Sequence, residues 1–181
     1  RDLDLFAANG HLQAEIGRVR DDVSYRQRAQ LFRNEGGGTF AEVRRRGTSA
    51  LGDSLAARGA TYGDLDGDGD LDVLLVENGG PVHLWENRTG EPDGRPGYLS
   101  VETAPAGSSP TVGTRIHAWV EGHRMERTVR GGGSYFSILP SAATFGLGGA
   151  DAVDSLRVDW PSGVVARRGR TAGGQTVRML P

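Results

Sequence analysis

One sequence pattern occurs twice in the first half of the chain and limits what that half can fold into. The segment DLDLFAANG (Asp2–Gly10) aligns with DLDVLLVENG (Asp70–Gly79), and the second copy has one extra residue. The segment LFRNEGGGTF (Leu31–Phe40) similarly resembles LWENRTG (Leu84–Gly90). Repeats of a few short strands are typical of β-propeller blades, which close into a ring only when about four to eight are present. The sequence therefore predicts partial propeller blades over residues 1–90.

Short apolar or alternating runs, separated by glycine-rich turns, continue along the rest of the chain. Alternation with a period of two residues is typical of half-buried strands, whereas helical periodicity is weak, with one helical turn expected within His11–Tyr25. We therefore predict an all-β fold. The predicted strands are Leu3–Ala8, Gln30–Arg33, Thr39–Val43, Arg58–Tyr62, Leu71–Glu77, Val82–Asn87, Tyr98–Thr103, Arg115–Glu121, Arg124–Arg130, Ala143–Phe145, Ser155–Trp160, Val164–Arg167 and Thr176–Leu180.

A turn-rich segment with few apolar side chains divides the chain into two parts. It is Thr89–Gly97, which reads TGEPDGRPG and favours a linker. We predict one domain over residues 1–90 and a small, sandwich-like β domain over residues 97–181. In the second domain the stretches TRIHAWVEG and LRVDW alternate apolar residues with polar or aromatic ones, so one face of each can enter a core.

An acidic loop, DLDGDGDLD, has the residue pattern of a cation site. Its carboxylates alternate along the chain, at Asp64, Asp66, Asp68, Asp70 and Asp72. A calcium loop uses side chains at positions 1, 3 and 5, a backbone carbonyl at 7 and a further ligand near 9, with glycine at 6, which is Gly69 here. Oxygen-only ligands favour Ca²⁺ over Mg²⁺ or Mn²⁺. A solvated acidic turn is the alternative.

The residue at position 12 distinguishes this loop from helix–loop–helix calcium sites. Those sites place a bidentate Glu at position 12, where this chain has Leu75 within a strand-like apolar run. We therefore expect a loop that leads directly into a strand. The N-terminal copy of the repeat keeps only Asp2 and Asp4, which match Asp70 and Asp72, so no ion is expected there.

Two sets of segments resemble known families. DLDGDGDLDVLLVENG and YRQRAQLFRNEGGGTFAEV resemble the FG-GAP/VCBS repeats of integrin-like β-propellers. VGTRIHAWVEG (Val112–Gly122), RTVRGGGSYFS (Arg127–Ser137) and FGLGGADAVDSLRVDWPSG (Phe145–Gly163) resemble the ASPIC/UnbV domain. The order of the two is that of the cartilage acidic protein-like family. This resemblance implies an exported protein with calcium-binding repeats, and it implies that residues 1–90 are the truncated end of a longer propeller.

Composition excludes several classes of chemistry. The chain has no Cys and no Lys, which removes disulfides, thiolate metal sites and catalytic cysteines or lysines. A formal net charge of −2 gives no general attraction to nucleic acid, and no apolar run approaches the roughly 20 residues of a membrane-spanning helix. The block Gly52–Leu55 spells GDSL, but the Asp-x-x-His that such hydrolases need later in the chain is absent. His117 and His123 flank a predicted turn and could meet across it to hold a metal, but we expect both at the surface or its rim.

These observations favour a calcium-binding protein with a binding or adhesion role outside the cell, and with no catalytic activity. We expect it to be secreted, periplasmic or on the cell surface, with a protein or glycan ligand and not a nucleic acid. Two alternatives stay open. One is an enzyme or accessory domain that acts on an extracellular polysaccharide, and the other is a structural subunit that self-assembles into a surface assembly or filament.

Overall fold

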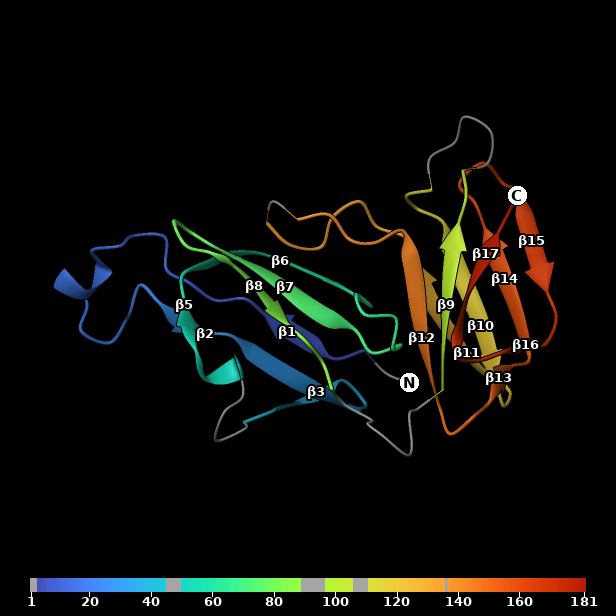
Figure 1. Ribbon diagram of the computed structural model, residues 1–181, viewed down its shortest axis with the longest axis horizontal. Coiled ribbons are helices and arrows are strands. Elements are labelled where there is room, and N and C mark those ends of the chain that lie inside the picture. Colours follow the sequence, from blue (N-terminus) through green and yellow to red (C-terminus); the bar gives the residue numbers. More distant parts are fainter. Residues whose placement is uncertain (1–2, 45–49, 89–96, 106–110, 136) are drawn as a thin grey trace.

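A computed structural model describes residues 3–44, 50–88, 97–105, 111–135 and 137–181, and it shows a protein built almost wholly of β-strands (Figure 1). Within these residues six small sheets carry the regular structure, and the helical elements are two 3-10 turns, η1 (Ile16–Arg18) and η2 (Ala50–Gly52). The predicted all-β fold is therefore confirmed, and η1 is the helical turn expected within His11–Tyr25. The predicted linker lies outside the described residues, apart from Gly97, and the division into two domains stays a prediction.

The repeat region, up to residue 88, contains three sheets. Two of them are three-stranded antiparallel sheets, with strand orders β1-β3-β4 and β6-β7-β8, and the third pairs β2 with β5. The strands are β1 (Leu5–Ala7), β2 (Gln27–Arg28), β3 (Gln30–Gly36), β4 (Thr39–Glu42), β5 (Ser54–Leu55), β6 (Ala57–Gly63), β7 (Asp72–Glu77) and β8 (Val82–Trp85). A small core joins them around buried Leu55 and Leu75, where Phe6 meets Trp85 edge to face at 5.9 Å.

The sequence repeat is also a structural repeat. In the first copy β1 pairs with β3 so that Leu5 lies opposite Phe32. In the second copy β7 pairs with β8 so that Val73 lies opposite Trp85, which is the same register. Two separate antiparallel strand pairs with one register are what partial propeller blades require, because each blade repeats one strand arrangement.

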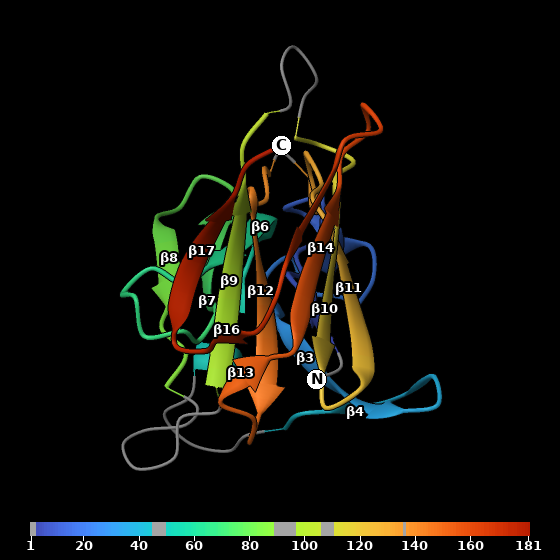
Figure 2. The same cartoon turned by 90° about the vertical axis from the view of Figure 1, so that its right-hand side faces the viewer.

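The C-terminal region, from residue 97, forms two facing sheets with a shared core, which confirms the sandwich-like prediction (Figure 2). One sheet has the order β11-β10-β14-β15 and the other β12-β9-β17, and a short pair joins β13 to β16. All pairs are antiparallel except β9 with β17. The strands are β9 (Gly97–Thr103), β10 (Arg115–Val120), β11 (His123–Thr128), β12 (Ala142–Gly148), β13 (Ala152–Val153), β14 (Ser155–Asp159), β15 (Val165–Arg168), β16 (Thr171–Ala172) and β17 (Gln175–Met179).

The core of this region contains the apolar residues that the alternating sequence pattern predicts. Ile116, Ala118 and Val120 on β10 are fully buried, and so are Leu99 and Phe145 on the facing sheet. Such a cluster excludes a large apolar area from water, at roughly 25 cal/mol per Å². It is the larger of the two cores, so most of the hydrophobic stabilisation of the described residues lies in this region.

The expectation that His117 lies at the surface was wrong. The residue is only 7% exposed, its Nδ1 lies 3.2 Å from a Glu126 oxygen, and its Nε2 lies 3.0 Å from an Asp159 oxygen. The register of β10 places Glu126 and Arg157 directly opposite His117 on the neighbouring strands, and the carboxylates of Glu126 and Asp159 contact the two ring nitrogens. His123 stays exposed and lies opposite Val120, so the two histidines do not meet.

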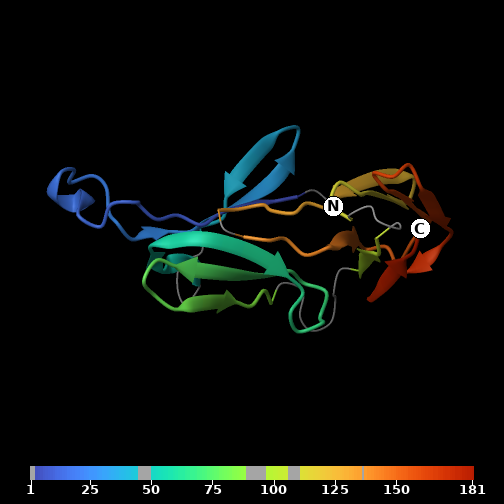
Figure 3. The same ribbon diagram turned by 90° about the horizontal axis from the view of Figure 1, so that it is seen from above.

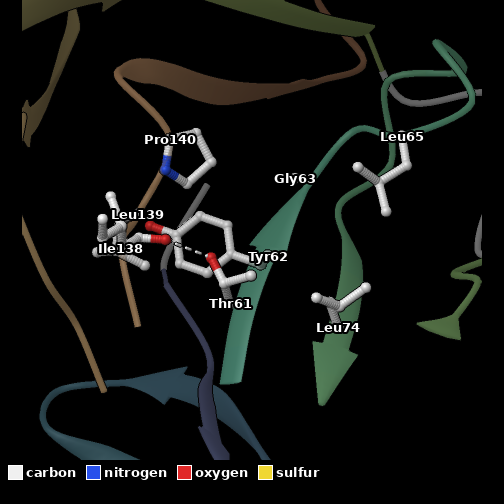
Figure 4. A pocket seen from close by; sticks show the side chains of 8 residues that line it. All are labelled: Thr61, Tyr62, Gly63, Leu65, Leu74, Ile138, Leu139 and Pro140. Atoms are coloured by element: carbon white, nitrogen blue, oxygen red, sulfur yellow. Dashed lines mark hydrogen bonds between the residues drawn. The ribbon is translucent and has the colours of Figure 1, made fainter. Parts of the chain in front are cut away.

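The C-terminal region contacts the repeat region through the segment between β11 and β12. The segment between β11 and β12, called the arm here (residues 129–135 and 137–141), extends along the repeat sheets (Figure 3). The hydroxyl of Thr61 on β6 donates a hydrogen bond of 2.8 Å to the carbonyl of Ile138. An apolar pocket of about 310 Å³ lies between the arm and the β6–β7 hairpin, lined by Leu65, Leu74 and Pro140 among others (Figure 4).

Candidate metal centre

The acidic loop closes the hairpin between β6 and β7. Gly63, the last residue of β6, pairs with Asp72, the first residue of β7. Leu75, which is position 12 of the loop, lies inside β7. The loop therefore leads directly into a strand, as the sequence predicts. The geometry of the loop is thus fixed at both ends by the sheet.

Within the loop, carboxylates accept hydrogen bonds from backbone N–H groups a few residues ahead. Asp64 accepts from the amides of Gly67 at 2.9 Å and Gly69 at 3.1 Å, and Asp66 accepts from Asp68 at 3.1 Å. Gly67 and Gly69 have φ values of +79° and +94°, a left-handed conformation that glycine adopts without the steric penalty of a β-carbon. These turns curl the chain so that alternate side chains point the same way.

Three of the five predicted ligands converge. Asp64, Asp66 and Asp68 each place one carboxylate oxygen within 4.8 Å of the other two. The hydrogen bond from the Asp68 amide lowers the pKa of Asp66. Desolvation and the charges of Asp68 and Asp72 raise it by more in total, so the pKa of Asp66 lies above its ordinary value. Three oxygen ligands that repel one another fit a hard cation such as Ca²⁺ by the chemistry of the donor set.

The other two predicted ligands have different surroundings. Asp72 is 2% exposed, and its carboxylate accepts the backbone N–H groups of Leu65 at 3.0 Å and Asn87 at 2.9 Å. Asp70 contributes its own amide to the carboxylate of Asp68, at 2.8 Å. Among the described residues neither belongs to the converging group, and ion binding by all five stays a prediction.

Sequence reasoning missed the contact between this loop and the C-terminal region. A β-carbon at Gly69 would overlap the ring of Tyr98, the second residue of β9. The ring therefore lies directly on the loop backbone, next to the carboxylate group. No local pattern signals this contact, because Tyr98 reads as an ordinary strand residue and the two positions lie in different parts of the chain.

A second polar cluster that sequence reasoning missed surrounds Glu77 at the far end of β7. Its carboxylate is 5% exposed, accepts the amide of Ala56 at 3.2 Å, and lies 2.5 Å from Arg26 and 3.2 Å from His83. The hydrogen bond from the Ala56 amide, with smaller contributions from His83 and Arg26, outweighs desolvation and lowers the pKa of Glu77. The cluster ties the end of β7 to the residue before β6, to the residue before β2 and to β8.

Comparison with known families agrees with the architecture. An FG-GAP-like repeat matches residues 2–75, and the ASPIC and UnbV family matches residues 104–180. No curated protein matches the chain. No helix in the described part of the chain is long and apolar enough to cross a membrane. FG-GAP repeats are typical of extracellular proteins. The chain thus combines an FG-GAP-like repeat region with a C-terminal ASPIC and UnbV region.

Proposed function

We propose that this chain is a calcium-stabilised protein that acts outside the cell, in binding or adhesion and without catalysis. The observation that carries the proposal is the convergence of Asp64, Asp66 and Asp68 within 4.8 Å. Three carboxylates at this separation repel one another in the absence of a cation. A bound Ca²⁺ would be held by their oxygens, and its charge would offset the repulsion and fix the β6–β7 hairpin.

The expected stabilisation is modest. Extracellular modules bind Ca²⁺ with dissociation constants of about 0.1–1 mM. At a few times to tenfold excess of the ion over that constant, binding to the folded state adds about 1 kcal/mol. For a chain of this size such a gain raises the melting temperature by about 3 °C.

The test is thermal unfolding in chelator and in 5 mM CaCl₂, with a matched pair of variants. Asp66→Asn keeps an oxygen for the amide of Asp68 but removes one charge from the converging group. Asp21→Asn removes one charge from an exposed residue that is far from the acidic loop in the sequence. We expect calcium to stabilise the wild type and Asp21→Asn equally, and Asp66→Asn by less than half as much. Equal melts of the wild type in chelator and in calcium would contradict the proposal.

A second role, as a subunit that self-assembles, is favoured by one surface of the repeat region. On the sheet β6-β7-β8, Val76 lies opposite Val82, and Leu84 follows on the same face. These side chains are 44%, 60% and 56% exposed, and β8 is an edge strand of its sheet. Exposed apolar side chains beside a free strand edge are a surface for further pairing. Light scattering tests this role, since a monomer at all concentrations contradicts it.

A further inference from the structure

The outward side of the four-stranded C-terminal sheet is a polar surface that neither core uses. Ile116, Ala118 and Val120 of β10 point into the core, so the alternate residues of β10 and their cross-strand partners point outward. This surface is called the outer face. Its central members, from the strand register, are Arg115, His117, Trp119, Arg124, Glu126, Arg157, Asp159 and Arg167.

The outer face is basic although the whole chain has a net charge of −2. It carries four arginines against two carboxylates. Arg157 is bound to Asp159 at 2.7 Å, and Arg124 lies 3.3 Å from Glu126. Arg115 and Arg167 are exposed, and within the described residues neither makes an ion pair. Two guanidinium groups are therefore available to an anion, and a third, Arg157, is held in place by its neighbour.

The floor of this face is rigid. The His117 ring lies between Glu126 on β11 and Asp159 on β14, which links three strands through side chains as well as backbone. The Trp119 ring lies beside it with its centroid 6.0 Å away, tilted by 43°. Trp119 is half-buried, so it presents a fixed apolar ring among the charged groups. A ligand would meet a surface that needs little reordering, and that lowers the entropic cost of binding.

We propose that the outer face binds an acidic polysaccharide, a chain of sugars that carry carboxylate or sulfate groups. Arginine binds such anions with two parallel hydrogen bonds, and the Trp119 ring can pack against the apolar faces of a sugar. Strands about 4.8 Å apart and same-face residues about 6.7 Å apart place Arg115 roughly 12 Å from Arg167 and roughly 14 Å from Arg124. These separations exceed one sugar ring, so the ligand is a chain and not a monosaccharide.

The two carboxylates on the face distinguish this ligand from a polyphosphate or nucleic acid. Glu126 is 38% exposed and lies beside Arg124 and His117, where it would repel a closely spaced row of phosphates. A sugar hydroxyl, in contrast, donates a hydrogen bond to a carboxylate. A surface of mixed charge with one aromatic ring therefore fits a ligand whose anionic groups alternate with hydroxyls. This inference names the partner within the proposed extracellular binding role, but it does not depend on the cation.

The test is binding of the full chain to polygalacturonate, with polyphosphate and neutral dextran as comparison polymers. The variant Arg115→Ala with Arg167→Ala removes the two unpaired charges. Its matched control, Arg18→Ala with Arg178→Ala, removes the same charge from exposed residues elsewhere. We expect the dissociation constant for polygalacturonate to rise at least tenfold in the first variant and less than twofold in the control. Trp119→Ala should weaken binding to polygalacturonate and leave binding to polyphosphate unchanged, with near-ultraviolet circular dichroism as the check of folding.

Three outcomes would overturn the inference. They are no binding by the wild type, equal weakening in both double variants, and tighter binding of polyphosphate than of polygalacturonate. The titrations are run in chelator and in calcium. Binding that is the same in both, together with identical melts, would refute the calcium proposal and leave the assignment of the outer face standing.

Discussion

The two copies of the repeat close their strand pairs in the same way. In the first copy the carboxylate of Asp4 accepts the backbone N–H of Asn34 at 2.8 Å. In the second copy Asp72 accepts the backbone N–H of Asn87 at 2.9 Å. The paired strands have the same register, although only the second copy has the full acidic loop among the described residues. The last aspartate of the pattern thus binds the chain of the partner strand in both copies, at Asn34 inside β3 and at Asn87 just beyond β8.

The copies differ in what surrounds that aspartate. Asp4 is exposed and Leu5 is 52% exposed, whereas Asp72 is 2% exposed and Val73, the equivalent of Leu5, is half-buried. The second copy also has Glu77 where the first has Ala8, and the cluster around Glu77 holds its hairpin at the other end. One local hydrogen bond therefore has two very different environments, and burial determines how much stability depends on it.

The largest predicted effect compares the two aspartates in chelator, where no ion contributes. Asp72→Ala removes a buried carboxylate and leaves two partly buried N–H groups without that partner, which costs about 3 kcal/mol. Asp4→Ala leaves one N–H group exposed to water and costs less than about 1 kcal/mol. Urea unfolding measures both changes. Equal losses in the two variants would show that burial does not distinguish the copies.

An effect of similar size concerns the two glycines of the acidic loop. Gly67→Ala introduces a β-carbon at a positive φ with nothing near it, at a cost of about 1 kcal/mol. Gly69→Ala adds an overlap with the Tyr98 ring, for a total of about 3 kcal/mol. Urea midpoints measured in the wild-type and Tyr98→Ala backgrounds separate the cost of the positive φ from the cost of the overlap with the ring. If Gly69→Ala costs no more than Gly67→Ala, the loop and β9 are not in contact.

The smallest predicted effect concerns pH. The folded protein holds the pKa of Glu77 below the ordinary 4.5, so the charged carboxylate stabilises the fold above that value, and this contribution is lost as the pH falls through the folded pKa. Glu77→Gln should destabilise the protein at pH 7 and flatten its loss of stability in acid. Glu86→Gln, which removes an exposed carboxylate paired with Arg88, should change the profile much less. Melting curves from pH 3 to 7 measure both, and superimposable profiles would contradict the role of Glu77.

Short-range patterns predicted much of this molecule. Alternation located the long strands to within a few residues, and the spacing of the aspartates located the loop that brings Asp64, Asp66 and Asp68 together. The two-residue strands β2, β5, β13 and β16 were missed because a period of two needs more than two residues to be visible. The partners of His117 and Asp72 were missed for another reason. They come from other strands, and register is set by the whole sheet.

The parallel pairing of β9 with β17 has a consequence for how the C-terminal region is made. β9 lies at the centre of its sheet, yet one of its two neighbours is the last described strand. During synthesis on the ribosome, β9 emerges long before β17, so one side of it has no partner while about 70 residues are added at about 5–20 residues per second. For several seconds the nascent chain presents an apolar strand with an open edge, a stage at which a chaperone or a neighbouring chain can bind it.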